Sequence, residues 1–380
     1  MQREPMTSRE RVEAALDFRQ PDRVPIDINP TLSAYNQLKS LLDADCDDSP
    51  APNLAMEVIP HPEILDKIGI DLISLKIGGG KQLAGALPEK AVDAWGIEYR
   101  LTRQNAGQYY EVVTNPLKGA SARDLERYQW PEQPSEDRID RLREQAKSLY
   151  YGTDLALVGR FGGPILEIAG NLLGMEEWLV RLMSEPEFAA DLLSRIAGIC
   201  AAWDLSCIRE VGRYCSIIKV SGEDLGMQQG PLYPPARFRE IILPALRYRW
   251  DRVIEMRNRV GSRAKVMLHS CGSVRAYIPD LIESGIEVLD PLQPLAAGMD
   301  PGELHRDFGG RIVFHGGIDI QKLLPTGSPE EVYRATLACL EAFEARKGGF
   351  ILAPSHAVQA DTPPENIMAM VQAGRDYRGN

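Results

Sequence analysis

Short apolar segments with strand character alternate with helical segments along most of this 380-residue chain. The alternation is most regular from residue 216 onward, where every strand-like segment leads into a helix-like one. Such a pattern without sequence repeats is typical of a parallel sheet covered by helices. We predict eight strands, which begin near residues 24, 71, 156, 216, 265, 287, 312 and 350.

Eight strand–helix units favour a single α/β domain, a (β/α)8 TIM barrel over residues 1–380. An open doubly wound sheet is the alternative, but its glycine-rich first turn is missing. The triplet Gly78-Gly79-Gly80 lies in no phosphate-binding motif, so we interpret it as a strand-end loop. Residues 91–117 differ from the rest, because two alternating segments flank Gln104–Gly107 and predict a β-hairpin excursion.

Composition narrows the class of protein. The net charge of −11 argues against nucleic-acid or anionic-membrane partners, and 44% hydrophobic and 26% charged residues are typical of a globular protein in water. Six cysteines without framework spacing suit a reducing compartment. No apolar run approaches the roughly 20 residues of a membrane span, and the first ten residues are polar. We therefore expect a cytoplasmic protein, for which a homodimer is compatible with the sequence.

The segment Lys265–Gly272 carries the strongest chemical signal. Its strand runs into His269, Ser270 and Cys271 before Gly272 ends it. Side chains at i and i+2 of a strand share a face, so His269 and Cys271 project together. Imidazole and thiolate are suitable zinc ligands. The alternative is a hydrogen-bonded strand-end histidine beside a buried cysteine that packs as a small apolar residue.

In a TIM barrel, catalytic groups come from the C-terminal ends of different strands. The predicted strand ends supply the residues Asp27, Lys76, Arg160, Glu223, Asp224, His269, Cys271, Asp290, Gln293, His315, Asp319, Ser355 and His356. We predict that His269, Cys271, His356 and Glu223 meet over the barrel mouth as metal ligands. Three protein ligands with one exchangeable position describe a catalytic zinc.

Other assignments stay open on the residues alone. His356 is either a zinc ligand or a general acid or base. Glu223 and Asp224 are catalytic residues or belong to a solvated loop. His315 is either a substrate contact or a core histidine with its hydrogen bonds satisfied, and we favour the core. The remaining cysteines are expected to be inert.

Several motifs together resemble the uroporphyrinogen decarboxylase superfamily. They are Ser8–Leu16, Pro21–Pro25, Glu223–Gln228, Met267–Asp280, Asp290–Pro294, Gly316–Asp319, Pro354–His356 and Asp361–Asn366. The resemblance covers nearly the whole chain and implies a TIM barrel. The decarboxylases carry an arginine-rich M-R-Q-A-G-R stretch after the first strand, where this chain reads Asp27–Thr31 without arginine. After the second strand, Lys76–Gly80 stands where the decarboxylases have an aspartate.

The H-x-C of His269 and Cys271 resembles instead the zinc-dependent, corrinoid-linked methyltransferases of the superfamily. Their third ligand is a cysteine near the C-terminus in the coenzyme M-type enzymes, and His356 stands at that place here. The resemblance implies transfer of a methyl group between a small methylated ether, amine or thiol and a corrinoid. The chain has no D-x-H-x-x-G corrinoid motif, so a partner protein would supply the corrinoid.

The resemblance implies a role for each strand-end residue. Glu223 or Asp224 would orient the substrate or bind zinc. Arg160 and Gln293 would hold the polar part of the substrate, and Asp27 and His315 are further candidate substrate contacts. The role is predicted to be substrate-side demethylation, such as O-demethylation. A metal-free decarboxylase that uses His356 and Asp224 as acid and base is the alternative function, and a non-catalytic ligand-binding barrel is the least favoured.

Overall fold

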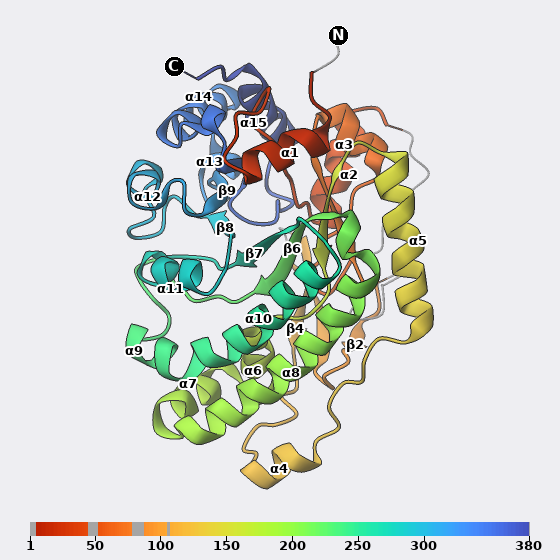
Figure 1. Ribbon diagram of the computed structural model, residues 1–380, viewed down its shortest axis with the longest axis vertical. Helices are drawn as coiled ribbons and strands as arrows, with labels where there is room; N and C mark the ends of the chain where they lie inside the picture. The colour runs from red at the N-terminus through yellow and green to blue at the C-terminus, as the bar shows by residue number, and fades with distance from the viewer. Residues whose placement is uncertain (1–4, 45–51, 78–86, 105–106, 380) are drawn as a thin grey trace.

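A curled sheet of seven parallel strands forms the centre of the molecule in a computed structural model that describes residues 5–44, 52–77, 87–104 and 107–379 (Figure 1). The strands lie side by side in the order β1 (Leu72–Lys76), β5 (Ala156–Arg160), β6 (Cys215–Gly222), β7 (Lys265–His269), β8 (Val288–Leu292), β9 (Val313–Ile318) and β10 (Phe350–Pro354). Every neighbouring pair is parallel. Chain order equals spatial order, which is the topology of a TIM barrel.

The segment 24–28 stands between β10 and β1, at the position of the first predicted strand. Ile26 bridges Leu352 in parallel, and Asp27 N–H donates to Leu352 O at 2.8 Å. On the other side, Asp71 N–H donates to Ile26 O at 2.9 Å. The prediction of a regular strand here was wrong, because pairing is limited to an isolated bridge. The segment nevertheless connects the two edges of the sheet, and the predicted barrel-like fold is confirmed.

The two faces of the sheet bury different apolar clusters. Side chains at alternate strand positions, among them Val158, Ile217, Met267 and Val288, form a compact cluster inside the curled sheet. Val12 and Leu16 of helix α1 belong to the same cluster, so α1 fills the N-terminal end of the barrel. The intervening strand residues pack outward against the helices in the main core. Because α1 fills the N-terminal end of the barrel, a substrate could reach the interior only from the C-terminal end.

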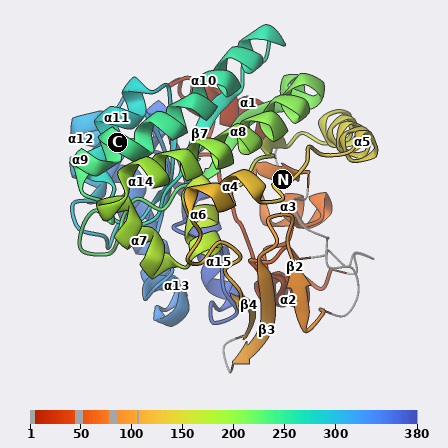
Figure 2. The same ribbon diagram turned by 90° about the horizontal axis from the view of Figure 1, so that it is seen from below.

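Helices surround the sheet, apart from α1, which fills the N-terminal end of the barrel (Figures 1 and 2). They are α1 (Ser8–Leu16), α2 (Leu32–Leu41), α3 (Pro62–Ile68), α4 (Ala122–Arg127), α5 (Glu136–Gly152), α6 (Ile165–Leu173), α7 (Met175–Ser184), α8 (Pro186–Val211), α9 (Pro235–Arg237), α10 (Leu243–Arg259), α11 (Ile278–Glu283), α12 (Pro301–Phe308), α13 (Leu323–Thr326), α14 (Pro329–Ala342) and α15 (Pro364–Asp376). Two helices begin at N-cap residues of the kind that the sequence pattern indicates. Thr7 before α1 and Ser328 before α14 each form a capping box. Within the described residues, no helix is long and apolar enough to cross a membrane.

The excursion after β1 is a small antiparallel sheet that stands beside the barrel (Figure 2). It contains β2 (Lys90–Val92), β3 (Glu98–Gln104) and β4 (Gly107–Val112) in that order. The predicted hairpin is therefore confirmed, with a third strand that the sequence pattern did not reveal. The predicted loop at Gly78–Gly80 and one of the six cysteines, Cys46, lie outside the described residues.

Candidate metal centre

A ring of polar side chains lies directly above the inner apolar cluster of the barrel. In five consecutive strands an inward apolar residue is followed two positions later by a polar one: Val158 by Arg160, Ile217 by Lys219, Met267 by His269, Val288 by Asp290, and Val313 by His315. Because strand side chains alternate, each polar residue faces the same interior as the apolar residue below it. The C-terminal mouth of the barrel thus collects the ionisable residues of five strands.

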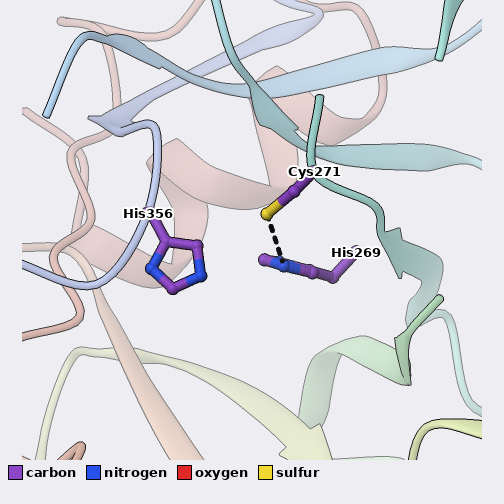
Figure 3. A group of neighbouring side chains, drawn as sticks. All are labelled: His269, Cys271 and His356. Atoms are coloured by element: carbon purple, nitrogen blue, oxygen red, sulfur yellow. Dashed lines mark hydrogen bonds between the residues drawn. The ribbon is translucent and has the colours of Figure 1, made fainter. Parts of the chain in front are cut away.

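Three potential metal ligands meet at this mouth (Figure 3). His269 ends β7, Cys271 follows two residues later, and His356 lies in the loop after β10. One ligand atom of each lies within 4.8 Å of the other two, and Cys271 Sγ is 3.3 Å from His269 Nε2. Ligands of a tetrahedral zinc lie about 3.6 Å apart at ordinary Zn–N and Zn–S distances. The geometry and the N,N,S donor set therefore fit a zinc ion with one position open.

Asp290 in β8, which pairs with His269 in β7, determines how His269 faces the centre. Its Oδ2 lies 2.8 Å from His269 Nδ1 and accepts from Lys219 Nζ at 2.5 Å. A carboxylate can only accept, so the ring proton of His269 lies on Nδ1 and the Nε2 lone pair faces Cys271 and His356. A carboxylate that accepts a hydrogen bond from the outer ring nitrogen fixes the tautomer and increases the basicity of a metal-binding histidine. The positive charges of Lys219 and His315, together with the hydrogen bond from His269, outweigh burial and hold the pKa of Asp290 well below its usual range.

The protonation preferences of the other two ligands differ. Burial, followed by the charges of Asp224 and Asp290, raises the pKa of the Cys271 thiol, and a metal ion bound to the sulfur reverses that preference. His356 is solvent-exposed, yet desolvation of its ring lowers its pKa and neighbouring His269 lowers it further. Neutral imidazole is the form that binds a metal. The lowered pKa is therefore compatible with both roles predicted for His356, metal ligand and general base.

The loop after β7 is held in place by a close backbone approach. Gly272 has φ +80°, and a Cβ at Gly226 would lie only 2.5 Å from Ser273 N. Leu225 N–H donates to Ser270 Oγ at 3.0 Å, and Gly272 N–H donates to Gln293 Oε1 at 2.9 Å. The glycines permit this contact because neither carries a side chain. Cys271 is thus held between two loops.

His315 lies deeper in the ring and is buried, as favoured from the sequence. Its Nδ1 donates to Asp290 Oδ1 at 2.7 Å and its Nε2 donates to Asp27 Oδ2 at 3.0 Å. Burial disfavours the imidazolium, but the charges of Asp290 and Asp27 outweigh burial and raise the pKa of His315 to about 9. His315 is therefore a cation between two carboxylates. Asp27 and His315 both belong to the polar ring beneath the metal ligands.

A pH dependence of stability follows from His315. A histidine with a raised pKa in the folded state stabilises the fold fully below its unfolded value of 6.5, and loses that contribution as pH rises through about 9. We expect the free energy of unfolding of the chelator-treated protein to fall between those values by about 1 kcal/mol or more through His315 alone. Urea unfolding at pH 6 and pH 9.5 gives the change in the free energy of unfolding between these two pH values. The difference between this change in wild type and in His315→Gln is the contribution of His315. The same change in both proteins would contradict the prediction.

Glu223 requires a correction, because the structure places it away from the three ligands. Its side chain is fully buried, and its two oxygens accept from Ile165 N–H and Leu166 N–H, each at 2.8 Å, at the N-terminus of α6. Burial raises its pKa to about 7. Glu223 therefore anchors α6 to β6 and is not one of the three candidate metal ligands. Asp224 is exposed instead, accepts from Cys271 N–H at 3.0 Å and lies 3.9 Å from His269 Nε2.

Of the two residues expected to hold the substrate, Arg160 forms an ion pair with a glutamate, whereas Gln293 lines a cavity. Arg160 Nη1 contacts Glu57 Oε2 at 3.3 Å, and Lys76 Nζ binds the same oxygen at 2.9 Å. Sequence reasoning missed Glu57, which follows no strand. Gln293 lines a cavity of about 340 Å³ beside the metal ligands. The cavity is lined by Gly226, Met227, Gln228, Cys271, Gly272, Gln293, Ile320, Gln321, Ser355 and His356.

Fold and site together define a parallel barrel with a candidate metal centre at its C-terminal mouth. The family model described as "Uroporphyrinogen decarboxylase (URO-D)" matches residues 92–377, well over half of the chain. The chain belongs to this family.

Two curated relatives show the range of the family. A methylated-thiol–coenzyme M methyltransferase of Methanosarcina mazei is 25% identical over 274 residues, 69% of this chain and 65% of that protein. The chain thus spans slightly less than two thirds of that relative. A uroporphyrinogen decarboxylase of Coxiella burnetii is 22% identical over 295 residues, 75% of this chain and 74% of the relative.

The solved structure of a methyltransferase from Methanosarcina mazei superposes with a TM-score of 0.65 at 19% identity. The match covers 98% of this chain and 99% of the other. At this identity the similarity establishes the common fold alone.

Proposed function

We propose that this chain is a zinc-dependent methyltransferase that moves a methyl group between a small methylated substrate and the corrinoid of a partner protein. The observation that carries the proposal is the group of His269, Cys271 and His356, with ligand atoms within 4.8 Å of one another at the barrel mouth. The similarity to a methylated-thiol–coenzyme M methyltransferase supports the reaction class.

Each residue of the site has a role in the proposal. His269, Cys271 and His356 hold zinc, which when bound supplies a Lewis acid for the heteroatom that carries the methyl group. Asp290 orients His269 through Nδ1. Asp224, exposed and 3.9 Å from His269 Nε2, is placed to exchange a proton with that heteroatom. The cavity lined by Gln293 holds the substrate.

Methyl transfer to free cob(I)alamin tests the proposal. The zinc-loaded protein is mixed with cob(I)alamin and one donor from each open class: 2-methoxyphenol, trimethylamine, glycine betaine or dimethyl sulfide. We expect the absorption spectrum of methylcobalamin to develop with at least one donor, and not after zinc is chelated. Failure with every donor in protein that holds zinc would overturn the proposal. Absence of zinc binding would direct attention to decarboxylation.

The contact of Asp290 with His269 yields a prediction on metal affinity. Asparagine has one acceptor oxygen, so in Asp290→Asn the amide cannot accept from both His269 and His315. We expect zinc affinity to fall about 10- to 100-fold, as it does when a residue that hydrogen-bonds a metal ligand is replaced. Competition against a chromophoric chelator measures the change. Asp319→Asn is the matched control: Asp319 also follows a strand, but it accepts from the backbone of residues 321–323. An unchanged affinity in Asp290→Asn would contradict the assigned role.

A further inference from the structure

Three cationic side chains stand in a row inside the barrel mouth, on the neighbouring strands β1, β5 and β6. Strand pairing places Lys76 beside Arg160 and Arg160 beside Lys219. Each lies two or four positions after an apolar residue of the inner cluster, so all three side chains face the barrel interior. Like charges directly beside one another on neighbouring strands are destabilising. The row therefore needs negative charge close to it.

The carboxylates that these cations contact do not balance them. Lys219 has a partner of its own, Asp290. Lys76 and Arg160 instead share a single oxygen of Glu57, at 2.9 and 3.3 Å. The other oxygen of Glu57 accepts from a neutral asparagine amide at 2.7 Å. Among the described residues, two positive charges on β1 and β5 thus share the one negative charge of Glu57.

The polar groups deeper in the ring do not supply the missing charge. His315 is a cation that lies between Asp290 and Asp27. These two carboxylates together balance His315 and Lys219. In the part of the chain that the structure describes, the excess of one positive charge on β1 and β5 therefore remains.

Two further carboxylates at the mouth lie on the side of the metal ligands. Asp224 lies 3.9 Å from His269 Nε2. Burial raises the pKa of Glu167 in α6, and the charge of Asp224 raises it further, which favours the neutral acid. Neither carboxylate forms an ion pair with Lys76 or Arg160 within the described chain.

The guanidinium of Arg160 has donors to offer to a ligand. Of its three nitrogens, only Nη1 has a partner among the described residues, the shared oxygen of Glu57. The side chain is 24% exposed, and neither Nε nor Nη2 is one of the buried polar atoms that lack a partner. Both nitrogens are therefore accessible to solvent. Together they form one edge of the planar guanidinium, which can donate to both oxygens of a carboxylate.

Lys76 shows the effect of the excess charge. Burial, followed by the charge of Arg160, lowers the pKa of Lys76 to about 8, although Glu57 opposes the shift. An anion bound beside the two cations would also oppose it, and both cations would then have negative charge close to them.

We propose that Arg160 and Lys76 bind a carboxylate of the substrate, so that the methyl donor is an organic acid. The Nε and Nη2 edge of Arg160 donates to the carboxylate, and Lys76 adds positive charge beside it. The strands of Arg160 and His269 are two strand spacings apart, roughly 10 Å, so several bonds separate the carboxylate from the methylated heteroatom. The identity of the acid as methyl donor rests on the proposed function, whereas the anion site does not.

Binding to zinc-free protein tests the anion site without any contribution from the positive charge of the metal. The probes are 4-methoxybenzoate and its neutral isostere 4-methoxybenzamide. Titration calorimetry on chelator-treated wild type is expected to show the acid binding at least about tenfold more tightly than the amide, because hydrogen bonds between charged groups are the stronger ones. Equal affinities, or tighter binding of the amide, would overturn the inference.

Variants place the site at Arg160. Arg160→Gln is expected to weaken binding of the acid about tenfold or more and to leave binding of the amide unchanged. Arg160→Lys keeps the charge but loses the planar edge, so its affinity should lie between those of wild type and Arg160→Gln. The matched control is Arg143→Gln, since Arg143 is a partly exposed arginine of α5 that pairs with Asp140 and Glu210. Wild-type affinity for the acid in Arg160→Gln would overturn the assignment, and should that variant fail to fold, the comparison of acid and amide in wild type decides.

Methyl transfer by the zinc-loaded protein separates this inference from the proposed function. If the acid binds at Arg160 but no donor of any class methylates cob(I)alamin, the anion site stands and the proposed function fails. If methyl transfer from 4-methoxybenzamide is as fast as from 4-methoxybenzoate, the proposed function stands and the assignment of an acidic substrate fails. Faster transfer from the acid, lost in Arg160→Gln at unchanged zinc content, would support both.

Discussion

Replacement of His269 by alanine or of Cys271 by serine is expected to remove zinc from the protein. Each variant leaves two of the three donors that lie within 4.8 Å of one another. Loss of a ligand should lower zinc affinity by more than about 100-fold, the upper range for substitutions of residues that only hydrogen-bond a ligand. Metal analysis by mass spectrometry should find about one zinc per chain in wild type and almost none in either variant.

The variant His356→Ala decides between the two roles predicted for that residue. If His356 is a ligand, zinc affinity falls in this variant as it does in the other two. If it is an acid or base, zinc remains bound and only methyl transfer is lost. His305→Ala is the control, because His305 is only partly buried and lies near Glu344, on a different part of the surface. Full zinc occupancy in both His269→Ala and Cys271→Ser would refute the metal centre.

The position of this centre was predictable because it depends on strand alternation and topology. His269 and Cys271 share a face by their i, i+2 spacing, and His356 lies in the loop directly after β10. Parallel order brings all C-terminal strand ends to one mouth, whatever their distance in sequence. Asp290 was already among the predicted strand ends, and the same argument would have found Lys219 had it been applied to the last inward residue of each strand as well as to the loop beyond.

The role of Glu223 could not be predicted, because it depends on an irregularity in β6. The pairing of β6 with β7 shifts register between Lys219 and Gly222, and Ser221 has φ +81°. Regular alternation from Ile217 and Lys219 would turn residue 223 inward. The bulge changes that parity, so Glu223 points to the N-terminus of α6 instead. A β-bulge has no reliable sequence signal. Strict alternation of side chains along the strand therefore assigns the residues after the bulge to the wrong face of the sheet.

The largest expected effect on stability comes from Asp71, which fastens the segment 24–28 to the barrel. Its carboxylate is fully buried and accepts from Arg11 Nη1 at 2.6 Å, from Arg23 Nη1 at 2.6 Å and from Ile26 N–H at 2.8 Å. Asp71→Ala removes the shared partner of two buried guanidinium groups. Breaking a buried ion pair on one side costs about 3–5 kcal/mol. Urea unfolding followed by circular dichroism measures the loss.

Asp66→Ala, an exposed change on α3, is the control and should alter stability by less than about 0.5 kcal/mol. A loss below about 1 kcal/mol in Asp71→Ala would mean that the cluster does not hold the barrel closed. Should that variant fail to fold, Arg23→Lys gives a milder test. It keeps the charge but loses the paired contacts of Nη1 and Nη2 with Asp71.

Hydrogen exchange in Arg23→Lys would show where the structure loosens. Asp27 N–H donates to Leu352 O and Leu352 N–H donates to Pro25 O, so these two amides report directly on closure between segment 24–28 and β10. We expect their protection to fall more than that of amides in the pairing of β7 with β8. A uniform fall would instead place the effect of the cluster on the whole fold. Because Asp27 also binds His315, local opening of this segment would reach the polar ring beneath the metal ligands.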